Sequence, residues 1–141
     1  MIIRSSKAII TFKQKYLLQL RDNKENIFFP GFWGLFGGRQ DNNEKEKLVV
    51  KREVKEETNL NVLISSQILS VNFHMIGLKK KRKITYFDCK IKKSPKITLN
   101  EGQKYNFFSF NELKRLKIVP MDFVAINCHY HKNNNFISLY R

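Results

Sequence analysis

The stretch from Gly38 to Leu60 reads GRQDNNEKEKLVVKREVKEETNL and contains the clearest helical pattern in the chain. From Asn43 to Thr58 no Pro or Gly interrupts it. Asn42 or Asn43 can cap the first turn, and Glu44 and Glu46 suit the positive end of a helix dipole. The sequence therefore predicts a helix over residues 43–58.

This helix would carry a cluster of acidic side chains near its C-terminal end. Glu53, Glu56 and Glu57 are spaced three and four apart, so their carboxylates share a face and repel one another. A hard divalent cation with oxygen ligands would relieve the repulsion, and Mg²⁺ is the usual choice. The glycine turn at Gly37 and Gly38 would let a backbone carbonyl approach the ion. The pattern indicates a metal site.

Two other features of the helix concern packing and orientation. Arg52 directly precedes the acidic cluster, and pairing with a glutamate would fix its side chain. We interpret Arg52 as an orienting residue. Val49, Val50 and Val54 form an apolar face that would seat the helix on a sheet.

Strands and further helices alternate along the rest of the chain, which predicts one α/β unit with a mixed sheet between helices. Lys7–Phe12 and Tyr16–Arg21 would form a hairpin, and the basic run Lys79–Lys83 an exposed hairpin tip. The other expected strands are 32–36, which ends at the glycine pair, 61–73, 83–91, 97–99, 105–108 and, at an edge, 136–140. Short helices are expected over 111–116 and, entered through Pro120, over 121–131.

Composition limits the class of protein. The 141 residues fit a single domain, and a net charge of +15 favours anionic partners such as nucleotides or nucleic acid, although a compositional bias toward Lys, Asn, Ile and Phe would produce the same excess. No apolar stretch is long enough to cross a bilayer and no signal peptide is recognisable, so we expect a cytoplasmic protein without a membrane partner. Cys89 and Cys128 are too few for a disulfide framework.

The spacing of these residues resembles the Nudix box, which runs from a glycine through a glutamate and an Arg-Glu pair to two further glutamates. The positions that match are Gly38, Glu44, Arg52, Glu53, Val54, Glu56, Glu57 and Leu60. Asn59 replaces the second glycine of the box, and Asn is the next-best residue for the left-handed conformation that ends a helix there. Phe36 stands where many family members have proline.

The resemblance implies a Nudix-type α/β/α sandwich over residues 1–141 and water attack on a phosphoanhydride bond of a nucleoside diphosphate derivative. It assigns Mg²⁺, with Mn²⁺ as the alternative, to Gly38, Glu53, Glu56 and Glu57. Glu53 or a second carboxylate would take the proton from water. Glu101, in a loop before a strand, is the candidate for that carboxylate, and its other interpretation is a simple turn residue.

Substrate contacts are expected from Arg21 and Arg39 on phosphates and from Phe29 or Trp33 on a base, although each could equally be a surface or core residue. A nucleotide sugar and a nucleoside triphosphate both fit as the small nucleotide substrate. The alternatives are an RNA-end hydrolase, for which nucleic acid would be the partner, and a Nudix-fold nucleotide- or RNA-binding module without turnover. A homodimer is also expected, because related folds often dimerise.

Overall fold

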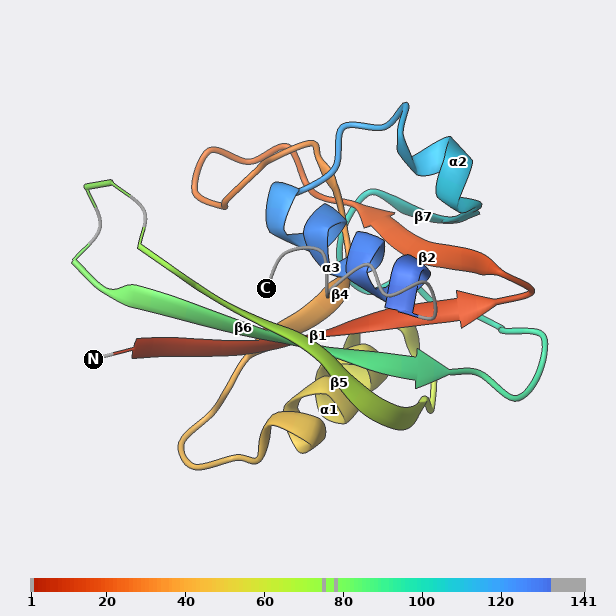
Figure 1. The fold of residues 1–141 in the computed structure, drawn as a ribbon, viewed down its shortest axis with the longest axis horizontal. Coiled ribbons are helices and arrows are strands. Elements are labelled where there is room, and N and C mark those ends of the chain that lie inside the picture. The colour runs from red at the N-terminus through yellow and green to blue at the C-terminus, as the bar shows by residue number, and fades with distance from the viewer. Residues whose placement is uncertain (1, 75, 78, 133–141) are drawn as a thin grey trace.

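The computed structural model describes residues 2–74, 76–77 and 79–132, which form a mixed sheet with helices on both faces (Figure 1). The strands run in the order β3-β2-β1-β6-β5, with β4 added to β1 and β7 added to β2. Helix α1 covers one face, and α3 with the short α2 lies at the other. The predicted α/β class with a mixed sheet between helices is confirmed. The strand bounds are Ile2–Phe12 (β1), Lys15–Leu20 (β2), Trp33–Gly34 (β3), Phe36–Arg39 (β4), Leu63–Phe73 (β5), Lys81–Lys90 (β6) and Lys104–Phe108 (β7), and the helix bounds are Glu46–Thr58 (α1), Phe110–Leu113 (α2) and Pro120–His131 (α3).

The N-terminal strand β1 is the centre of the sheet. Its end forms the predicted hairpin with β2, in which Thr11 faces Tyr16, and its residues 5–8 pair antiparallel with β4. Along its other edge β1 runs parallel to β6, from Ile2 beside Lys81 to Thr11 beside Lys90. This pairing makes β1 longer than the predicted strand.

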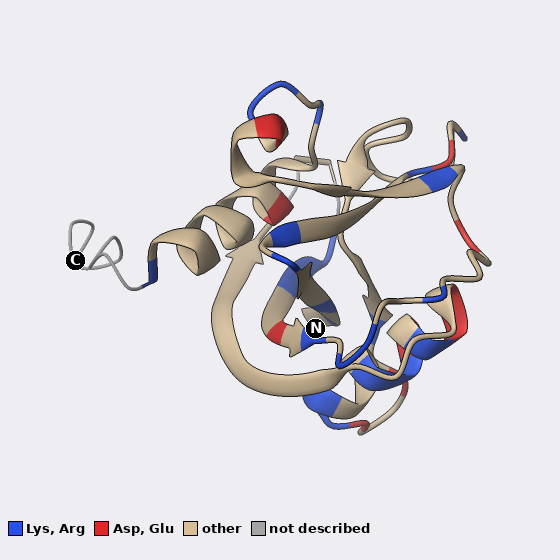
Figure 2. Ribbon diagram, turned by 90° about the vertical axis from the view of Figure 1, so that its right-hand side faces the viewer, with Lys and Arg blue, Asp and Glu red and all other residues tan. Residues whose placement is uncertain are grey.

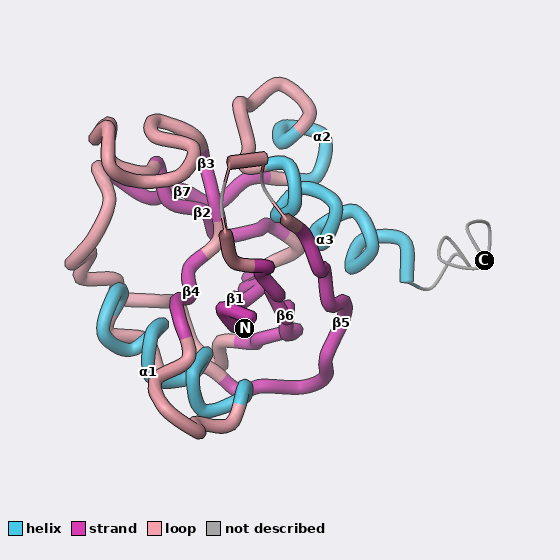
Figure 3. The backbone as a smooth tube through the Cα atoms, turned by 90° about the vertical axis from the view of Figure 1, so that its left-hand side faces the viewer, coloured by secondary structure: helices cyan, strands magenta, loops and turns pink. Residues whose placement is uncertain are grey.

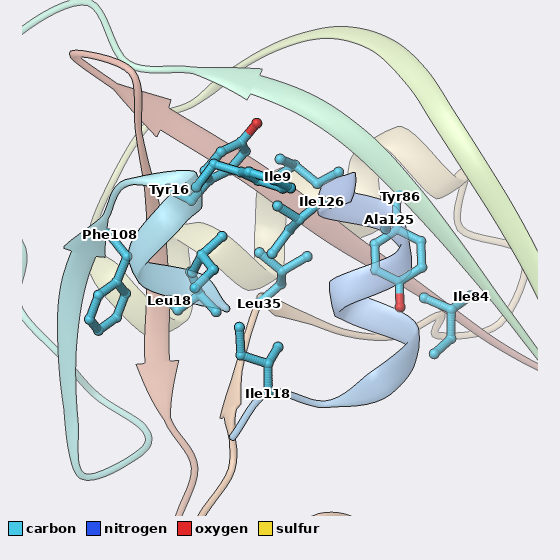
Figure 4. Close-up of a cluster of buried hydrophobic side chains, with 12 residues drawn as sticks. Ile9, Tyr16, Leu18, Leu35, Ile84, Tyr86, Phe108, Ile118, Ala125 and Ile126 are labelled. Atoms are coloured by element: carbon cyan, nitrogen blue, oxygen red, sulfur yellow. The ribbon is translucent and has the colours of Figure 1, made fainter. Parts of the chain in front are cut away.

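Two hydrophobic cores lie on opposite faces of the sheet, because successive side chains of a strand alternate between faces. Ala8 and Ile10 of β1 pack with Val50 and Val54 of α1. The residue between them, Ile9, packs on the other face with Ile126 of α3. Figure 4 shows the core on the α3 face, where Ile9, Leu18, Tyr86 and Ile126 lie close together.

The segment around the glycine pair differs from the prediction. The single expected strand over 32–36 is two strands, β3 and β4, separated by Leu35. Gly37 and Gly38 do not end a strand, because they lie inside β4 opposite Lys7 and Ser6. Phe36, at the position where proline is frequent, is completely buried in the core under α1.

The box helix α1 starts later than expected and ends where expected. Its N-cap is Lys45, which has no side-chain capping bond, so neither Asn42 nor Asn43 caps the helix. Asn59 ends the helix in the left-handed conformation, with φ 64° and a bond from its N–H to the Lys55 carbonyl. The role predicted for Asn59 is confirmed.

Three other expectations about elements change. The Lys79–Lys83 run is not confined to a hairpin tip, because Lys81–Lys83 already belong to β6. Residues 97–99 form no strand; there the chain follows the end of α1, where the N–H of Thr98 donates to the Thr58 carbonyl. The expected strand at 136–140 lies outside the described residues.

The remaining expectations on the C-terminal part hold closely. Helix α3 begins at Pro120 as predicted, and α2 is shorter than predicted, with Ser109 and Glu112 forming a capping box.

Cys89 and Cys128 are both free and buried. Among the described helices none is long and apolar enough to span a membrane. Homodimerisation, cytoplasmic location and a single domain over 1–141 stay predictions.

Candidate active site

The glutamates of the box lie where the end of α1 meets β4 and the loop before β7. The helix presents Glu53, Glu56 and Glu57 on its last two turns, and Val49, Val50 and Val54 are fully buried beneath it. Lys and Arg residues outnumber acidic residues in the ribbon, and several of the acidic residues lie on and around α1 (Figure 2). A cluster of acidic residues is therefore set into a basic molecule.

Arg52 organises the helix and the loop that precedes it. Its Nε and Nη2 both donate to Glu44, each at 2.9 Å, and its Nη1 donates to Glu53 at 2.9 Å. Nη2 also reaches the Arg39 carbonyl at 3.3 Å. The hydrogen bond with Arg52 lowers the pKa of Glu44, and the bond with Glu44 raises the pKa of Arg52. Arg52 thus contacts Glu44, Glu53 and the Arg39 carbonyl together, and its role as an orienting residue stays a prediction.

The sequence suggested that Glu44 occupies the first turn of the helix, but α1 begins only at Glu46. Glu44 lies in the loop before α1, and its two carboxylate oxygens accept one hydrogen bond each from the Arg52 guanidinium. The paired bonds fix loop 40–45 to the helix eight residues further on.

Glu57 is the most buried carboxylate of the cluster, only 4% exposed. Its Oε1 accepts a hydrogen bond of 3.0 Å from the backbone N–H of Gly37. Burial, followed by the hydrogen bond and charge of Glu101 and by the charge of Glu53, raises the pKa of Glu57 to about 9. The buried surroundings of Glu57 and the neighbouring carboxylates thus disfavour its charged form.

Glu53 lies directly against the second glycine of β4. A Cβ on Gly38 would come within 2.4 Å of the Glu53 carboxyl carbon, so only glycine leaves room for the side chain. Burial, and then the charges of Glu56 and Glu101, raise the pKa of Glu53 against the opposing effect of Arg52. Two neighbouring acids, Glu53 and Glu57, therefore both resist ionisation.

Glu101 reaches this cluster from the loop before β7. The loop is tied to the end of α1, because the N–H of Asn100 donates to the Glu57 carbonyl at 2.9 Å and its side-chain amide donates to the Glu56 carbonyl at 2.9 Å. Glu101 is near enough to Glu57 to contribute to the raised pKa of that carboxyl, so the loop brings a fourth carboxylate toward the helix. The catalytic role of Glu101 stays a prediction.

The donor set fits a hard divalent cation. Carboxylate oxygens that raise each other's pKa would be stabilised together by a dication, and oxygen is the ligand atom that Mg²⁺ prefers. Within the described ranges, no three His, Cys, Asp or Glu side chains are already arranged to hold an ion. Glu53 is turned toward Arg52 and Glu57 toward Gly37, so binding would redirect these two carboxylates.

A cavity of about 350 Å³ opens beside the glycine pair, and we call it the Phe28 cavity. Gly37 and Gly38 form part of its wall. The other lining side chains are mainly aromatic or cationic, including Phe28, Phe29, Phe73, Lys7, Arg21, Arg39 and Arg82, and no acid of the described chain lines it. Such a cavity suits a planar, negatively charged ligand.

The Phe28 cavity contains three of the four predicted substrate residues. Arg21, Arg39 and Phe29 line it, and Arg21 Nε donates to the Phe28 carbonyl at 3.0 Å. Trp33 is not among its lining residues. It packs edge-on against Phe108, with ring centroids 4.8 Å apart, because β3 lies between β2 and the start of α3.

Among the lining residues that sequence reasoning missed, Phe28 and Arg82 contact each other. Arg82 lies over the Phe28 ring, 4.7 Å from its centroid, and its Nε is buried without a hydrogen-bond partner among the described residues. The two residues are far apart in the sequence and belong to no motif. Only the placement of the loop over residues 22–31 beside β6 brings them together.

Comparisons with known proteins agree with this geometry. The family model described as NUDIX domain matches residues 3–126. The fold is similar to that of a MutT protein from Methanosarcina mazei Go1, with a TM-score of 0.77, 24% identity and coverage of 96% of each chain. A DNA mismatch repair protein MutT from methicillin-resistant Staphylococcus aureus 252 gives a TM-score of 0.72 and 28% identity, with 90% of this chain and 94% of that chain covered.

A more distant similarity links the fold to another kind of hydrolase. A C. elegans Ap4A hydrolase matches with a TM-score of 0.75 and 17% identity, over 95% of this chain and 99% of that chain. A comparison with curated proteins gave no significant match.

Proposed function

Because the chain belongs to the NUDIX domain family of pyrophosphohydrolases, we propose that it hydrolyses a phosphoanhydride bond in a nucleoside diphosphate linked to another group. The observation that carries the proposal is the position of the glutamate cluster. Glu53 lies against Gly38, and Gly37 and Gly38 also line the Phe28 cavity. A ligand in the cavity would therefore have its phosphates beside the carboxylates.

Glu53, Glu56 and Glu57, with the Gly38 carbonyl, are the groups that would hold Mg²⁺, and Mn²⁺ would suit the same oxygens. When bound, the ion supplies charge neutralisation on the phosphates and lowers the pKa of water. Without the ion, Arg52 holds Glu53 and the N–H of Gly37 holds Glu57, and both carboxylates would turn from these partners toward the ion. We assign orientation, not substrate contact, to Arg52.

Two carboxylates can take the proton from the attacking water, Glu53 and Glu101. Glu101 is supported by its exposure and by its loop, which the bonds of Asn100 hold against the end of α1. Glu53 is supported by its closeness to Gly38 and the cavity. We propose that one of these two residues is the general base.

The substrate side of the proposal rests on the Phe28 cavity. A base can stack on Phe28 or Phe29, and Arg21 and Arg39 lie within reach of phosphates. A nucleoside triphosphate and a nucleotide sugar both have these parts. The similar structures named MutT and Ap4A hydrolase support a nucleotide class without selecting one member of it.

The test is a substrate panel with purified protein and Mg²⁺: nucleoside triphosphates, nucleotide sugars, dinucleoside polyphosphates and capped RNA. We expect turnover of at least one compound, and a fall of at least about 100-fold in kcat for Glu56→Gln and Glu57→Gln. Glu46→Gln is the matched control, because Glu46 is on the same helix and pairs with Lys83 outside the cluster.

Unchanged activity in both cluster variants would overturn the site assignment. Binding of a nucleotide with no turnover of any compound would favour a Nudix-fold binding module instead. Turnover of capped RNA alone would identify an RNA-end hydrolase.

A further inference from the structure

A second cavity of about 280 Å³ lies on the other side of Arg39, and we call it the Arg4 cavity. Its wall is built from the start of β1, the loop after β4 and Lys80 at the β5–β6 connection. Figure 3 looks onto this end of the molecule, where β4 lies on one side of β1 and β6 on the other, with α1 below. No residue of the glutamate cluster lines it.

The side chains of the Arg4 cavity differ in kind from those of the Phe28 cavity. Arg4, Arg39 and Lys80 are cationic, and the loop adds the amides of Gln40, Asn42 and Asn43. The lining described here contains no aromatic ring and no acid. A base needs a stacking surface, whereas a phosphate needs cations and N–H donors, so this cavity suits a phosphate and not a base.

The positive charge in this cavity is not neutralised by the protein. Across the described ranges, Arg4, Arg39 and Lys80 form no ion pair, although Lys83 nearby pairs with Glu46 at 3.4 Å. Uncompensated cations that converge on one hollow favour an anionic ligand.

The Arg4 cavity adjoins the Phe28 cavity, because Arg39 lines both cavities. Its wall is also well fixed, because the N–H of Gln40 donates to the Arg4 carbonyl at 2.9 Å and Arg52 donates to the Arg39 carbonyl at 3.3 Å. Gly38, beside Glu53, is the residue next to Arg39. A substrate with phosphates beside Gly38 and Glu53 would therefore reach the Arg4 cavity by extending past Arg39.

We propose that the Arg4 cavity is a second phosphate subsite, which takes a phosphate of the substrate beyond the cleaved phosphoanhydride. The proposal rests on the proposed function and narrows its substrate class. The extra phosphate belongs either to a longer 5′-phosphate chain or to the first internucleotide linkage of an RNA 5′ end. A nucleotide sugar has no such group, so the subsite gives it no advantage.

The test compares Arg4→Gln/Lys80→Gln with the control Lys92→Gln/Lys93→Gln, which removes the same charge from an exposed loop beyond the far end of β6. The substrates are a nucleoside 5′-tetraphosphate, a 5′-triphosphorylated dinucleotide and a uridine diphosphate sugar. Binding of inorganic tripolyphosphate without metal is measured by calorimetry in all proteins, because this readout does not depend on turnover.

We expect the first double variant to raise KM by at least about tenfold for the substrate with the extra phosphate, with kcat unchanged, and to weaken tripolyphosphate binding. The substrate whose KM rises, tetraphosphate or dinucleotide, identifies the source of the phosphate. An equal effect of the control variant, or an equal rise for the sugar substrate, would overturn the subsite.

The two proposals can fail separately. If the wild-type chain hydrolyses none of the compounds, the proposed function fails and the tripolyphosphate titration alone decides on the subsite. In that case, loss of binding in Arg4→Gln/Lys80→Gln but not in the control supports it, and equal binding in all proteins refutes it.

Discussion

Gly37 and Gly38 are neighbours in β4, but each is required for a different reason. A Cβ on Gly37 would come within 2.2 Å of the Ser6 carbonyl oxygen, which is backbone and cannot move away, and its φ of 153° disfavours other residues. The three atoms nearest to a Cβ on Gly38 all belong to the carboxylate end of Glu53, which can swing aside. Gly37 is therefore required by the packing of β4 against β1, and Gly38 by the position of the Glu53 carboxylate.

Alanine at Gly37 should therefore reduce mainly the stability of the fold, and alanine at Gly38 mainly the activity. We expect Gly37→Ala to lose about 3 kcal/mol of stability or more. Gly38→Ala should lose less than about 1 kcal/mol but about 100-fold in kcat/KM, because Glu53 is displaced. Urea unfolding and steady-state hydrolysis separate the two. A fully active Gly38→Ala protein would show that Glu53 has no part in catalysis.

Asn59 is the position where the chain departs from the family pattern, and its φ of 64° shows what the pattern requires. Asn tolerates this conformation, glycine adopts it freely and alanine does not. We expect Asn59→Ala to lose about 1 kcal/mol and Asn59→Gly to equal or exceed the wild type. Circular dichroism in a urea series measures both, and equal losses in the two variants would contradict the argument.

Individual residues were predictable where local geometry decides their role. The left-handed conformation of Asn59 follows from helix geometry, and the pairing of Arg52 with glutamates follows from a short motif, so the sequence was sufficient for these two features. Glu44 was misplaced, because its strongest partner is a guanidinium two turns away and not the helix dipole. Arg82 and Phe28 were missed because their contact is tertiary.

At the scale of elements, α3 is held on the sheet by a buried chain of polar groups. His129 of α3 contacts Asp88 of β6 through Nε2 at 2.9 Å and the Tyr16 hydroxyl of β2 through Nδ1 at 2.9 Å. Lys132 lies 3.9 Å from the same Asp88 carboxylate. One side chain thus joins a helix to two strands.

This arrangement predicts how stability depends on pH. The hydrogen bond with His129 lowers the pKa of Asp88 below its ordinary value of 3.8, against burial, which raises it. A lowered folded-state pKa gives stability that is present above the unfolded value and is lost as pH falls through the folded one. Between pH 5 and pH 3, wild type should therefore lose more stability than Asp88→Asn, measured by thermal unfolding. Parallel curves for the two proteins would refute this role of Asp88.

The bounds of an element were predictable only where nearby residues, such as a proline or a short turn, mark its start or end. Pro120 marks the start of α3, and the hairpin between β1 and β2 follows from two apolar runs and a short turn. The split of the strand around Leu35 was not predictable, because β3 pairs with β2 whereas β4 pairs with β1. The absence of a strand at 97–99 has a similar cause, since that segment bonds to the end of α1.

At the scale of the whole molecule, the net charge of +15 has two explanations, attraction of an anionic substrate or compositional bias. Salt separates them, because screening weakens attraction over distances beyond about 10 Å at 0.1 M. If the charge steers the substrate, KM should rise on the order of tenfold between about 50 and 500 mM KCl at constant free Mg²⁺, with kcat unchanged. A KM independent of salt would assign the charge to composition.

The parallel pairing of β1 with β6 has a consequence for how the chain is made. Strand β1 leaves the ribosome about 80 residues before its longest partner, residues 81–90, so the centre of the sheet cannot close while the segment between them is being synthesised. At about 5–20 residues per second, this delay lasts roughly 4–16 s. Throughout that interval the apolar stretch Ala8–Ile10 of β1 lacks its partner strand β6 and can pair wrongly. We therefore expect a chaperone to bind this part of the chain early in synthesis.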